Sequence, residues 1–189
     1  MADITFITGN QHKVEALEKW LGFSLKHHKL DLDELQELDP KLVVEHKAKQ
    51  AYEILKTAVL IEDTALWFHS LGRLPGTFVK WFIEEIGNDG LCRLLKDFDD
   101  RSATASVIYG YYDGQNVQTF EGTVDGTIND LPQGESGFGW DPIFIPEGAD
   151  KTYAQMHADG SDSELSHYSV RNKAVAKLKE FLDIPVQQA

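Results

Sequence analysis

The chain alternates strand patterns with helix patterns, and this alternation limits the folds that it can adopt. Residues 3–8 read as a β-strand, and residues 14–22 follow with apolar side chains at helical spacing up to a final glycine. Residues 25–32 read as a second strand, residues 44–55 as a second helix, and residues 58–64 as a buried strand that ends in two acids. Strands that alternate with helices indicate an α/β fold with a partly parallel sheet.

A different pattern occupies the middle of the chain. Residues 77–87 and 90–98 look helical, and residues 104–128 read as a hairpin or meander with turn signals at Asp113-Gly114 and Asp125-Gly126. We therefore expect the chain to form a second, antiparallel lobe.

Length and composition limit the class of protein. A chain of 189 residues with 42% hydrophobic residues is long enough for one domain with a substantial core. Cys92 is the only cysteine, which excludes an internal disulfide and suits a reducing compartment. No apolar run approaches the roughly 18 residues that cross a membrane, and the first ten residues lack the pattern of a secretory signal. We therefore expect a soluble, cytoplasmic protein without a membrane partner.

The net charge of -13 limits the kind of ligand. It argues against binding a nucleic-acid polymer, because that affinity comes mainly from many Lys and Arg contacts to phosphates. A single anionic small molecule remains compatible with this charge. Such a ligand needs a few local lysines and a divalent cation that the abundant carboxylates can hold.

The first strand and the first helix meet at Thr8-Gly9-Asn10, with Lys13 in the first helical turn. In one interpretation the glycine serves only the backbone, since it tolerates positive φ at no steric cost. In the other it lets a phosphate approach the helix N-terminus, where N–H groups and the helix dipole favour negative charge. The sequence is not a P-loop, which has a longer Gly-rich segment, and both interpretations stay open at this point.

Acidic residues follow two of the expected strands. Glu34 and Glu37 lie in the loop after the second strand, and Glu62 and Asp63 end the third. Ligands commonly bind at strand ends in α/β proteins, and magnesium is usually held by one or two carboxylates together with substrate phosphates. The acids therefore suit a metal-nucleotide site, although surface charge also explains the loop acids and a helix or turn cap also explains Asp63-Thr64.

The segment "SGFGWDP" combines aromatic, glycine and acidic residues. Phe138 and Trp140 offer flat apolar faces, Gly137 and Gly139 permit a close backbone approach, and Asp141 can accept a hydrogen bond from a ring N–H. Such a set suits a planar base. A tight turn that places aromatic side chains in the core explains the same residues.

Taken together, these segments resemble the inosine triphosphate pyrophosphatase family. The resemblance covers nearly the whole chain, and "GFGWDPIF" and "LPGTFVKWF" are its most specific motifs. The matching segments, in order, are "TGNQHK", "LDELQE", "HKAKQA", "IEDTALWF", "LGRLPGTFVKWF", "FEGTVDGTI", "GFGWDPIFIP", "TYAQM" and "SVRNKAVAKLKEFL".

The resemblance implies an activity and a fold. The activity is hydrolysis of non-standard purine nucleoside triphosphates (ITP, dITP and XTP) to the monophosphate and pyrophosphate. The fold is a single α/β domain over residues 1–189, with an elongated mixed β-sheet, flanking helices and two lobes around a central cleft. A magnesium ion and a homodimer are implied as well.

The family's site residues carry over to this chain by position. Glu34 and Asp63 are implied to hold magnesium, with Asp63 also orienting the attacking water, and Lys13 is implied to act as a catalytic cation. The implied substrate contacts are Thr8, Gly9, Asn10, Lys13, Lys47 and Lys80 for the phosphates, Phe138, Gly139, Trp140 and Asp141 for the base, and Thr64 in addition.

One segment departs from the family pattern. Family members usually carry Glu-Lys-Asn and then Ser-His-Arg before the last helix, whereas this chain reads "HADGSDSELSHYSVRNKA" and lacks the lysine. Aligning Ser169-Val170-Arg171 preserves the last helix and places Arg171 in the base pocket. Aligning Ser166-His167 keeps the histidine but puts Tyr168 at the arginine position, and we prefer the first register.

Two other functions fit parts of the sequence. A purine-nucleotide-binding module without catalysis fits the altered segment near the C-terminus. A Maf-type pyrophosphatase acting on pyrimidine or modified nucleotides is a third interpretation. The presence of Glu34, Asp63 and Lys13 favours an enzyme over the binding module, and a panel of substrates would separate the two kinds of pyrophosphatase.

Overall fold

The computed structural model describes residues 4–160 and 166–183 as a mixed α/β fold. Seven strands form one sheet in the order β2-β1-β3-β5-β6-β7, with β4 paired to β3. The strands are β1 (Thr5–Ile7), β2 (Lys26–His28), β3 (Val59–Phe68), β4 (Pro75–Gly76), β5 (Ser102–Tyr112), β6 (Val117–Ile128) and β7 (Phe144–Pro146). The helices are α1 (Gln11–Leu21), α2 (Pro40–Leu55), η1 (His69–Leu71), α3 (Val79–Leu94), α4 (Tyr153–Ala158) and α6 (Val170–Phe181). The predicted mixed sheet with flanking helices is confirmed.

Two compact units divide the chain, where the sequence predicted two lobes. Unit 1 comprises residues 1–64, 107–122 and 171–189, and unit 2 comprises residues 65–106 and 123–170. Strands β3, β5 and β6 contribute residues to both units. In the described part of the chain, no helix has the length and apolar character needed to span a bilayer.

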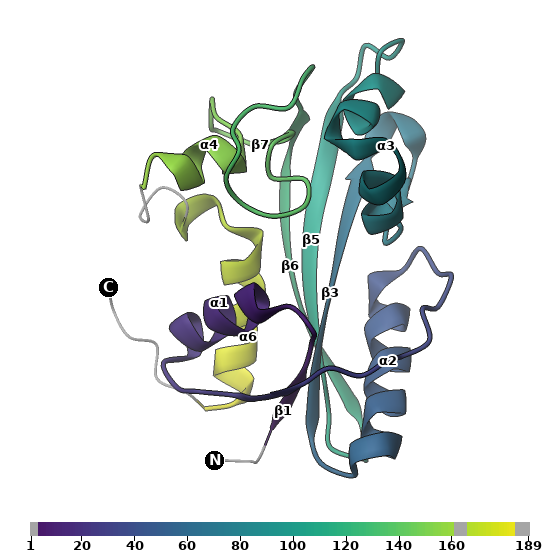
Figure 1. The fold of residues 1–189 in the computed structure, drawn as a ribbon, viewed down its shortest axis with the longest axis vertical. Coiled ribbons are helices and arrows are strands. Elements are labelled where there is room, and N and C mark those ends of the chain that lie inside the picture. The colour runs from purple at the N-terminus through teal and green to yellow at the C-terminus, as the bar shows by residue number, and fades with distance from the viewer. Residues whose placement is uncertain (1–3, 161–165, 184–189) are drawn as a thin grey trace. The chain divides into compact units, whose positions relative to one another are not determined.

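Unit 1 is built on parallel strands. The three residues of β1 are buried and pair with β3 in parallel register, Thr5 opposite Val59 and Ile7 opposite Ile61. Figure 1 shows α1 and α6 on one face of these strands and α2 on the other. Both faces of β1 are therefore covered, which explains why its sequence is apolar throughout.

The core of unit 1 lies between the sheet and α2. Asp39 caps this helix by accepting the backbone N–H of Lys41, and Pro40 occupies the first turn, where its missing N–H costs nothing. The buried cluster beneath the helix consists of Ile7, Val44, Ala48, Ala51, Val59, Ile61 and Ile108. The predicted apolar stripe of this helix is confirmed.

Strand β3 corrects one sequence-based expectation. The strand does not end at Glu62 and Asp63 but continues to Phe68, because apolar residues follow the acids and pair with β4. Thr64 therefore lies within a strand, and the alternative of a helix or turn cap at this point is wrong. Since β1 ends at Ile7, opposite Ile61, the two acids lie just beyond the carboxyl end of the neighbouring strand.

Unit 2 combines antiparallel strand pairing with helices. The two predicted helical segments form α3, which is kinked where Gly87 adopts φ 66° and ψ 179°. The predicted hairpin is confirmed for β5 and β6, whose connection contains Asp113-Gly114. Figure 1 shows α3 and α4 on opposite sides of the strands of this unit.

The second predicted turn, at Asp125-Gly126, is wrong because both residues lie inside β6. Gly126 pairs with Pro146 of β7, and a Cβ atom at Gly126 would come within 2.2 Å of the Ile145 carbonyl oxygen and 2.7 Å of the Phe144 ring. The glycine therefore permits a close approach of β7 rather than a change of chain direction.

Replacement of Gly126 by alanine tests this packing. We expect Gly126→Ala to destabilise the protein by about 1 to 3 kcal/mol, because the added methyl group overlaps backbone atoms of β7 that cannot move freely. Thr127→Ala, at an exposed position of the same strand, is the control. Urea denaturation measures both, and equal stability of the two variants would contradict the assigned close approach.

Candidate active site

The turn between β1 and α1 is held by its own side chains. The Thr8 hydroxyl accepts the Asn10 backbone N–H at 3.1 Å, and the Asn10 side chain caps α1 by accepting the His12 backbone N–H at 3.0 Å. Gly9 is not among the residues with positive φ, so the conformational interpretation of this glycine is wrong. A Cβ atom at Gly9 would lie 3.0 Å from the Lys29 side chain. The glycine therefore lets the Lys29 side chain pack closely against the turn at the N-terminus of α1.

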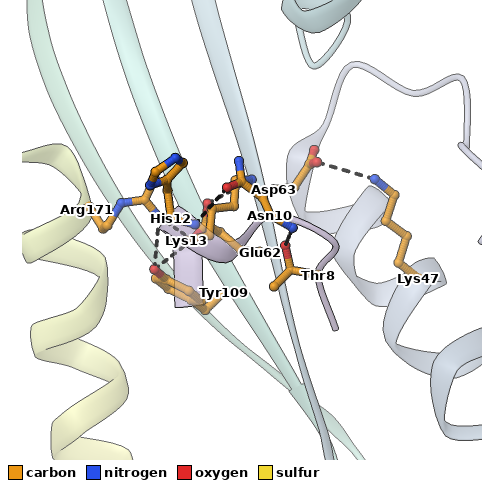
Figure 2. Close-up of polar contacts among 9 residues, drawn as sticks. All are labelled: Thr8, Asn10, His12, Lys13, Lys47, Glu62, Asp63, Tyr109 and Arg171. Atoms are coloured by element: carbon orange, nitrogen blue, oxygen red, sulfur yellow. Dashed lines mark hydrogen bonds and ion pairs between the residues drawn. The ribbon is translucent and has the colours of Figure 1, made fainter. Parts of the chain in front are cut away.

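Four polar side chains from four elements meet beside this turn (Figure 2). Glu62 of β3 is buried, and its Oε1 lies 3.1 Å from the Lys13 ammonium of α1. Its Oε2 accepts a hydrogen bond from the Tyr109 hydroxyl of β5 at 2.9 Å and forms an ion pair with the Arg171 guanidinium of α6. Arg171 also donates to the Tyr109 hydroxyl at 3.2 Å. One carboxylate therefore holds two cations in place.

The charges of this cluster are well defined. Burial by itself would raise the pKa of Glu62, but the adjacent Arg171 and Lys13 outweigh it and lower the pKa to about 2. Burial and the neighbouring Glu62 carboxylate raise the pKa of Tyr109 well above its ordinary value. Near neutral pH, Glu62 is therefore ionised and Tyr109 is a neutral hydrogen-bond donor.

Asp63 points to the other face of the strand, as the alternation of side chains along β3 requires. Its Oδ1 lies 3.4 Å from the Lys47 ammonium of α2, and the same ammonium lies 2.6 Å from Oε2 of Glu34 (Figure 2 shows the Asp63 contact). The structure therefore brings the two predicted metal-linked acids together around one lysine.

The two faces of β3 differ in proton affinity. Burial raises the pKa of Asp63, and the nearby Glu34 adds to this effect, while Lys47 and Lys13 oppose it. Burial would lower the pKa of Lys47, but the carboxylates of Asp63 and Glu34 raise it overall. Asp63 therefore accepts a proton more readily than the neighbouring Glu62, whose pKa is lowered.

The carboxylates around Lys47 fit a magnesium ion that is shared with a substrate. In residues 4–160 and 166–183, no group of three or more His, Cys, Asp or Glu side chains could hold a metal by itself. Magnesium does not need such a group, since it commonly takes one or two carboxylates together with phosphate oxygens and waters. Glu34 and Asp63 supply this number of carboxylates, from a loop and a strand.

The predicted base residues lie in unit 2 and form a tight turn. The Asp141 carboxylate accepts the Phe138 backbone N–H at 2.6 Å, and the Asn88 side chain donates to the Gly139 carbonyl at 3.0 Å. Trp140 is buried, as the tight-turn interpretation predicts, whereas the Phe138 side chain is 53% exposed. The role of this turn at the base stays a prediction.

Lys80 and His167 also belong to unit 2. Lys80 is exposed on α3, where its ammonium lies 5.3 Å from the centre of the Trp81 ring, and its phosphate role stays a prediction. His167 is exposed and packs edge to face against Tyr168. The last helix begins at Val170, which agrees with the helix that the preferred register was chosen to preserve.

Reasoning from the sequence missed Tyr109 and selected Asp63, rather than Glu62, as the metal-linked acid of this strand. Tyr109 stands in a run of apolar strand residues, where nothing distinguishes it from a core aromatic residue. Only the strand order brings its hydroxyl to Glu62. Arg171 was predicted in the base pocket, and the structure shows its guanidinium paired with Glu62 instead of open to solvent. Its contact with a base stays a prediction.

Comparisons with known proteins agree with this fold. The Ham1 family model matches residues 4–181. The inosine triphosphate pyrophosphatase of Batrachochytrium dendrobatidis is 46% identical over 185 residues, which are 96% of this chain and 94% of that protein. The inosine triphosphate pyrophosphatase of Schizosaccharomyces pombe is 41% identical over 187 residues, which are 97% and 96% of the two chains. The Ham1 protein of Staphylococcus aureus superposes with a TM-score of 0.75 at 25% identity, covering 95% of this chain and 98% of that chain.

The mixed sheet with flanking helices and the strand-turn-helix at Thr8-Gly9-Asn10 define a protein of the α/β class. The match over residues 4–181 shows that the chain belongs to the Ham1 family. The resemblance inferred from the sequence motifs is confirmed.

The buried Glu62 predicts a specific dependence of stability on pH. Because the pKa of Glu62 is lowered in the folded state, its ion pairs stabilise the protein above the ordinary pKa and lose this effect as the pH falls towards about 2. We expect Glu62→Gln to reduce the free energy of unfolding by about 3 kcal/mol near pH 7 and by much less near pH 3.

Urea denaturation over this pH range measures the difference between the wild type and the variant. Glu53→Gln is the matched control, because Glu53 forms an exposed ion pair with Lys56 and such pairs contribute little to stability. A difference between wild type and Glu62→Gln that does not change with pH would contradict the assigned charge state.

Proposed function

We propose that this protein hydrolyses non-standard purine nucleoside triphosphates, namely ITP, dITP and XTP, to the monophosphate and pyrophosphate, and thereby removes them from the nucleotide pool. The shared name of the two fungal relatives supports this activity. The observation that carries the proposal is the arrangement of Glu34 and Asp63 around Lys47, close to the turn that carries Lys13.

The triphosphate is assigned to the turn and to the lysines. Thr8, Gly9 and Asn10 form a narrow turn at the N-terminus of α1, where the helix dipole favours anions. Lys13 adds a positive charge in the first helical turn, and Glu62 holds its ammonium in position. Lys47 supplies a second cation, so that the leaving pyrophosphate meets fixed positive charge.

Magnesium is assigned to Glu34 and Asp63. When bound, the ion would neutralise charge on the phosphates and so help the pyrophosphate to leave. Glu34 is half exposed and lies in a loop, whereas Asp63 is fixed in β3. The strand fixes one ligand, and the loop brings the other to it.

The charge states favour Asp63 over Glu62 as the residue that orients the attacking water. A general base works best when its pKa approaches the operating pH. The pKa of Asp63 is raised, whereas that of Glu62 is lowered to about 2 and both of its oxygens face cations or a hydroxyl donor. Glu62 therefore positions Lys13 and Arg171, and Asp63 acts on the water.

The base is assigned to Phe138, Gly139, Trp140 and Asp141, with Arg171 and Thr64 as further substrate contacts and Lys80 as a further phosphate cation. Hypoxanthine and xanthine carry a 6-oxo acceptor next to an N1–H donor, and adenine reverses this edge. A pocket that hydrogen-bonds one edge can reject the reverse edge by a factor of about 10⁴. The exposed ring of Phe138 supplies a surface for stacking.

Pyrophosphate release tests the activity directly. With magnesium, we expect ITP, dITP and XTP to yield pyrophosphate much faster than GTP, ATP or dTTP, because adenine reverses the edge described above and GTP adds a 2-amino group. Omission of magnesium should abolish turnover. Orthophosphate as the first product of ITP would contradict the proposal, and preferred cleavage of dTTP would favour the Maf-type alternative.

Replacement of Asp63 separates fold from chemistry. Asp63→Asn keeps the shape of the side chain but removes its charge and its basicity, so we expect kcat to fall by about 10² or more. The thermal midpoint should change little, because Asp63 is not part of the Glu62 cluster. Near-normal turnover of this variant would assign the water to another residue.

The homodimer is proposed on family resemblance, and the cytoplasmic location on the free cysteine Cys92, which suits a reducing compartment. Sedimentation at micromolar concentration should give twice the monomer mass of 21.3 kDa. A single species at the monomer mass would contradict the dimer without affecting the proposed reaction.

A further inference from the structure

The loop between β2 and α2 carries one of the two proposed metal ligands, Glu34. The loop has no helix or strand over residues 29–39, so its position depends on contacts with the rest of unit 1. Leu30 and Leu32 pack against the core cluster beneath α2. Beyond Leu32 the chain turns outward, and Glu34 is 53% exposed with its carboxylate 2.6 Å from the Lys47 ammonium.

A second contact holds the residue immediately before Glu34. The Gln50 side chain of α2 accepts the Asp33 backbone N–H at 3.0 Å and donates to the Asp33 carboxylate at 2.8 Å. These bonds fix the orientation of the Gln50 amide. If the amide were flipped, its oxygen would face the Asp33 carboxylate and its N–H group would face the Asp33 backbone N–H. Its nitrogen also lies 3.0 Å from Nε2 of His46, which therefore acts as an acceptor.

Helical spacing places these anchors on one face of α2. Lys47 and Gln50 are three residues apart, so they lie next to each other and hold the consecutive loop residues Glu34 and Asp33. The two anchors differ in one respect, since Lys47 is a cation that the proposed phosphates would attract. Gln50 is neutral and has no such competing role.

We propose that Gln50 is a positioning residue that holds Glu34 at the magnesium site while Lys47 turns to the phosphates. This inference rests on the proposed function. The two bonds to Asp33 fix the backbone next to Glu34 without using the Glu34 carboxylate, which stays available to the metal. We call the two hydrogen bonds between Gln50 and Asp33 the Gln50 clamp. An open surface cavity of about 510 Å³ lies beside Gln50 and gives water access to the clamp, so its hydrogen bonds must persist in competition with water.

A polarity swap tests the clamp. Gln50→Glu removes the N–H that Asp33 accepts and places two carboxylates face to face. The double variant Gln50→Glu/Asp33→Asn restores a donor opposite an acceptor, with the direction of the side-chain bond reversed. Lys49→Ala, on the wall of the same cavity, is the control, because the described residues show no hydrogen bond from Lys49 to this loop.

Two measurements read out the clamp. Hydrogen exchange of the nucleotide-free protein should accelerate in residues 31–35 of Gln50→Glu, recover in the double variant and stay unchanged in Lys49→Ala. The magnesium concentration for half-maximal ITP cleavage should rise about tenfold in Gln50→Glu and return towards the wild-type value in the double variant, with kcat at saturating magnesium nearly constant.

The outcomes separate this inference from the proposed function. A magnesium-dependent wild type in which Gln50→Glu leaves both measurements unchanged would overturn the role of Gln50 alone. Loss of activity in Gln50→Glu without rescue by the double variant would also overturn it. A wild type that cleaves ITP without magnesium would overturn the metal assignment and this inference together.

Discussion

The candidate site depends on one buried carboxylate. Glu62 is almost fully enclosed, and an unpaired carboxylate there would carry a large desolvation cost. The cost is offset because Lys13 and Arg171 form ion pairs with it and the Tyr109 hydroxyl donates a hydrogen bond to it. These partners come from α1, α6 and β5, so the same interactions that neutralise Glu62 fix the elements around the Thr8-Gly9-Asn10 turn.

The alternation of side chains along β3 separates two functions that the sequence places side by side. Glu62 faces the two cations of the buried cluster, and its low pKa makes it a poor base. Asp63 faces Lys47 and Glu34, where burial raises its pKa. Adjacent acids of similar chemistry thereby acquire different partners and different proton affinities from their environments.

The sequence predicted the parts of this site that rest on local pattern or on family resemblance. The strand-turn-helix around Gly9, the helix that carries Lys47 and the family itself are confirmed. The end of β3 was misplaced because strand pairing with β4, rather than the charge of Asp63, decides where the strand stops. Tyr109 could not be found from the sequence, because its contact with Glu62 depends on strand order between residues 47 positions apart.

Glu34 and Asp63 are proposed to hold one divalent cation together with the nucleotide. Electron paramagnetic resonance of Mn²⁺, with a non-hydrolysable ITP analogue, tests it most directly. We predict one bound Mn²⁺ per chain in the wild type and loss of the bound signal in the double variant Glu34→Gln/Asp63→Asn, with the Lys49→Ala control unchanged. Equal Mn²⁺ binding by the wild type and the double variant would contradict the account.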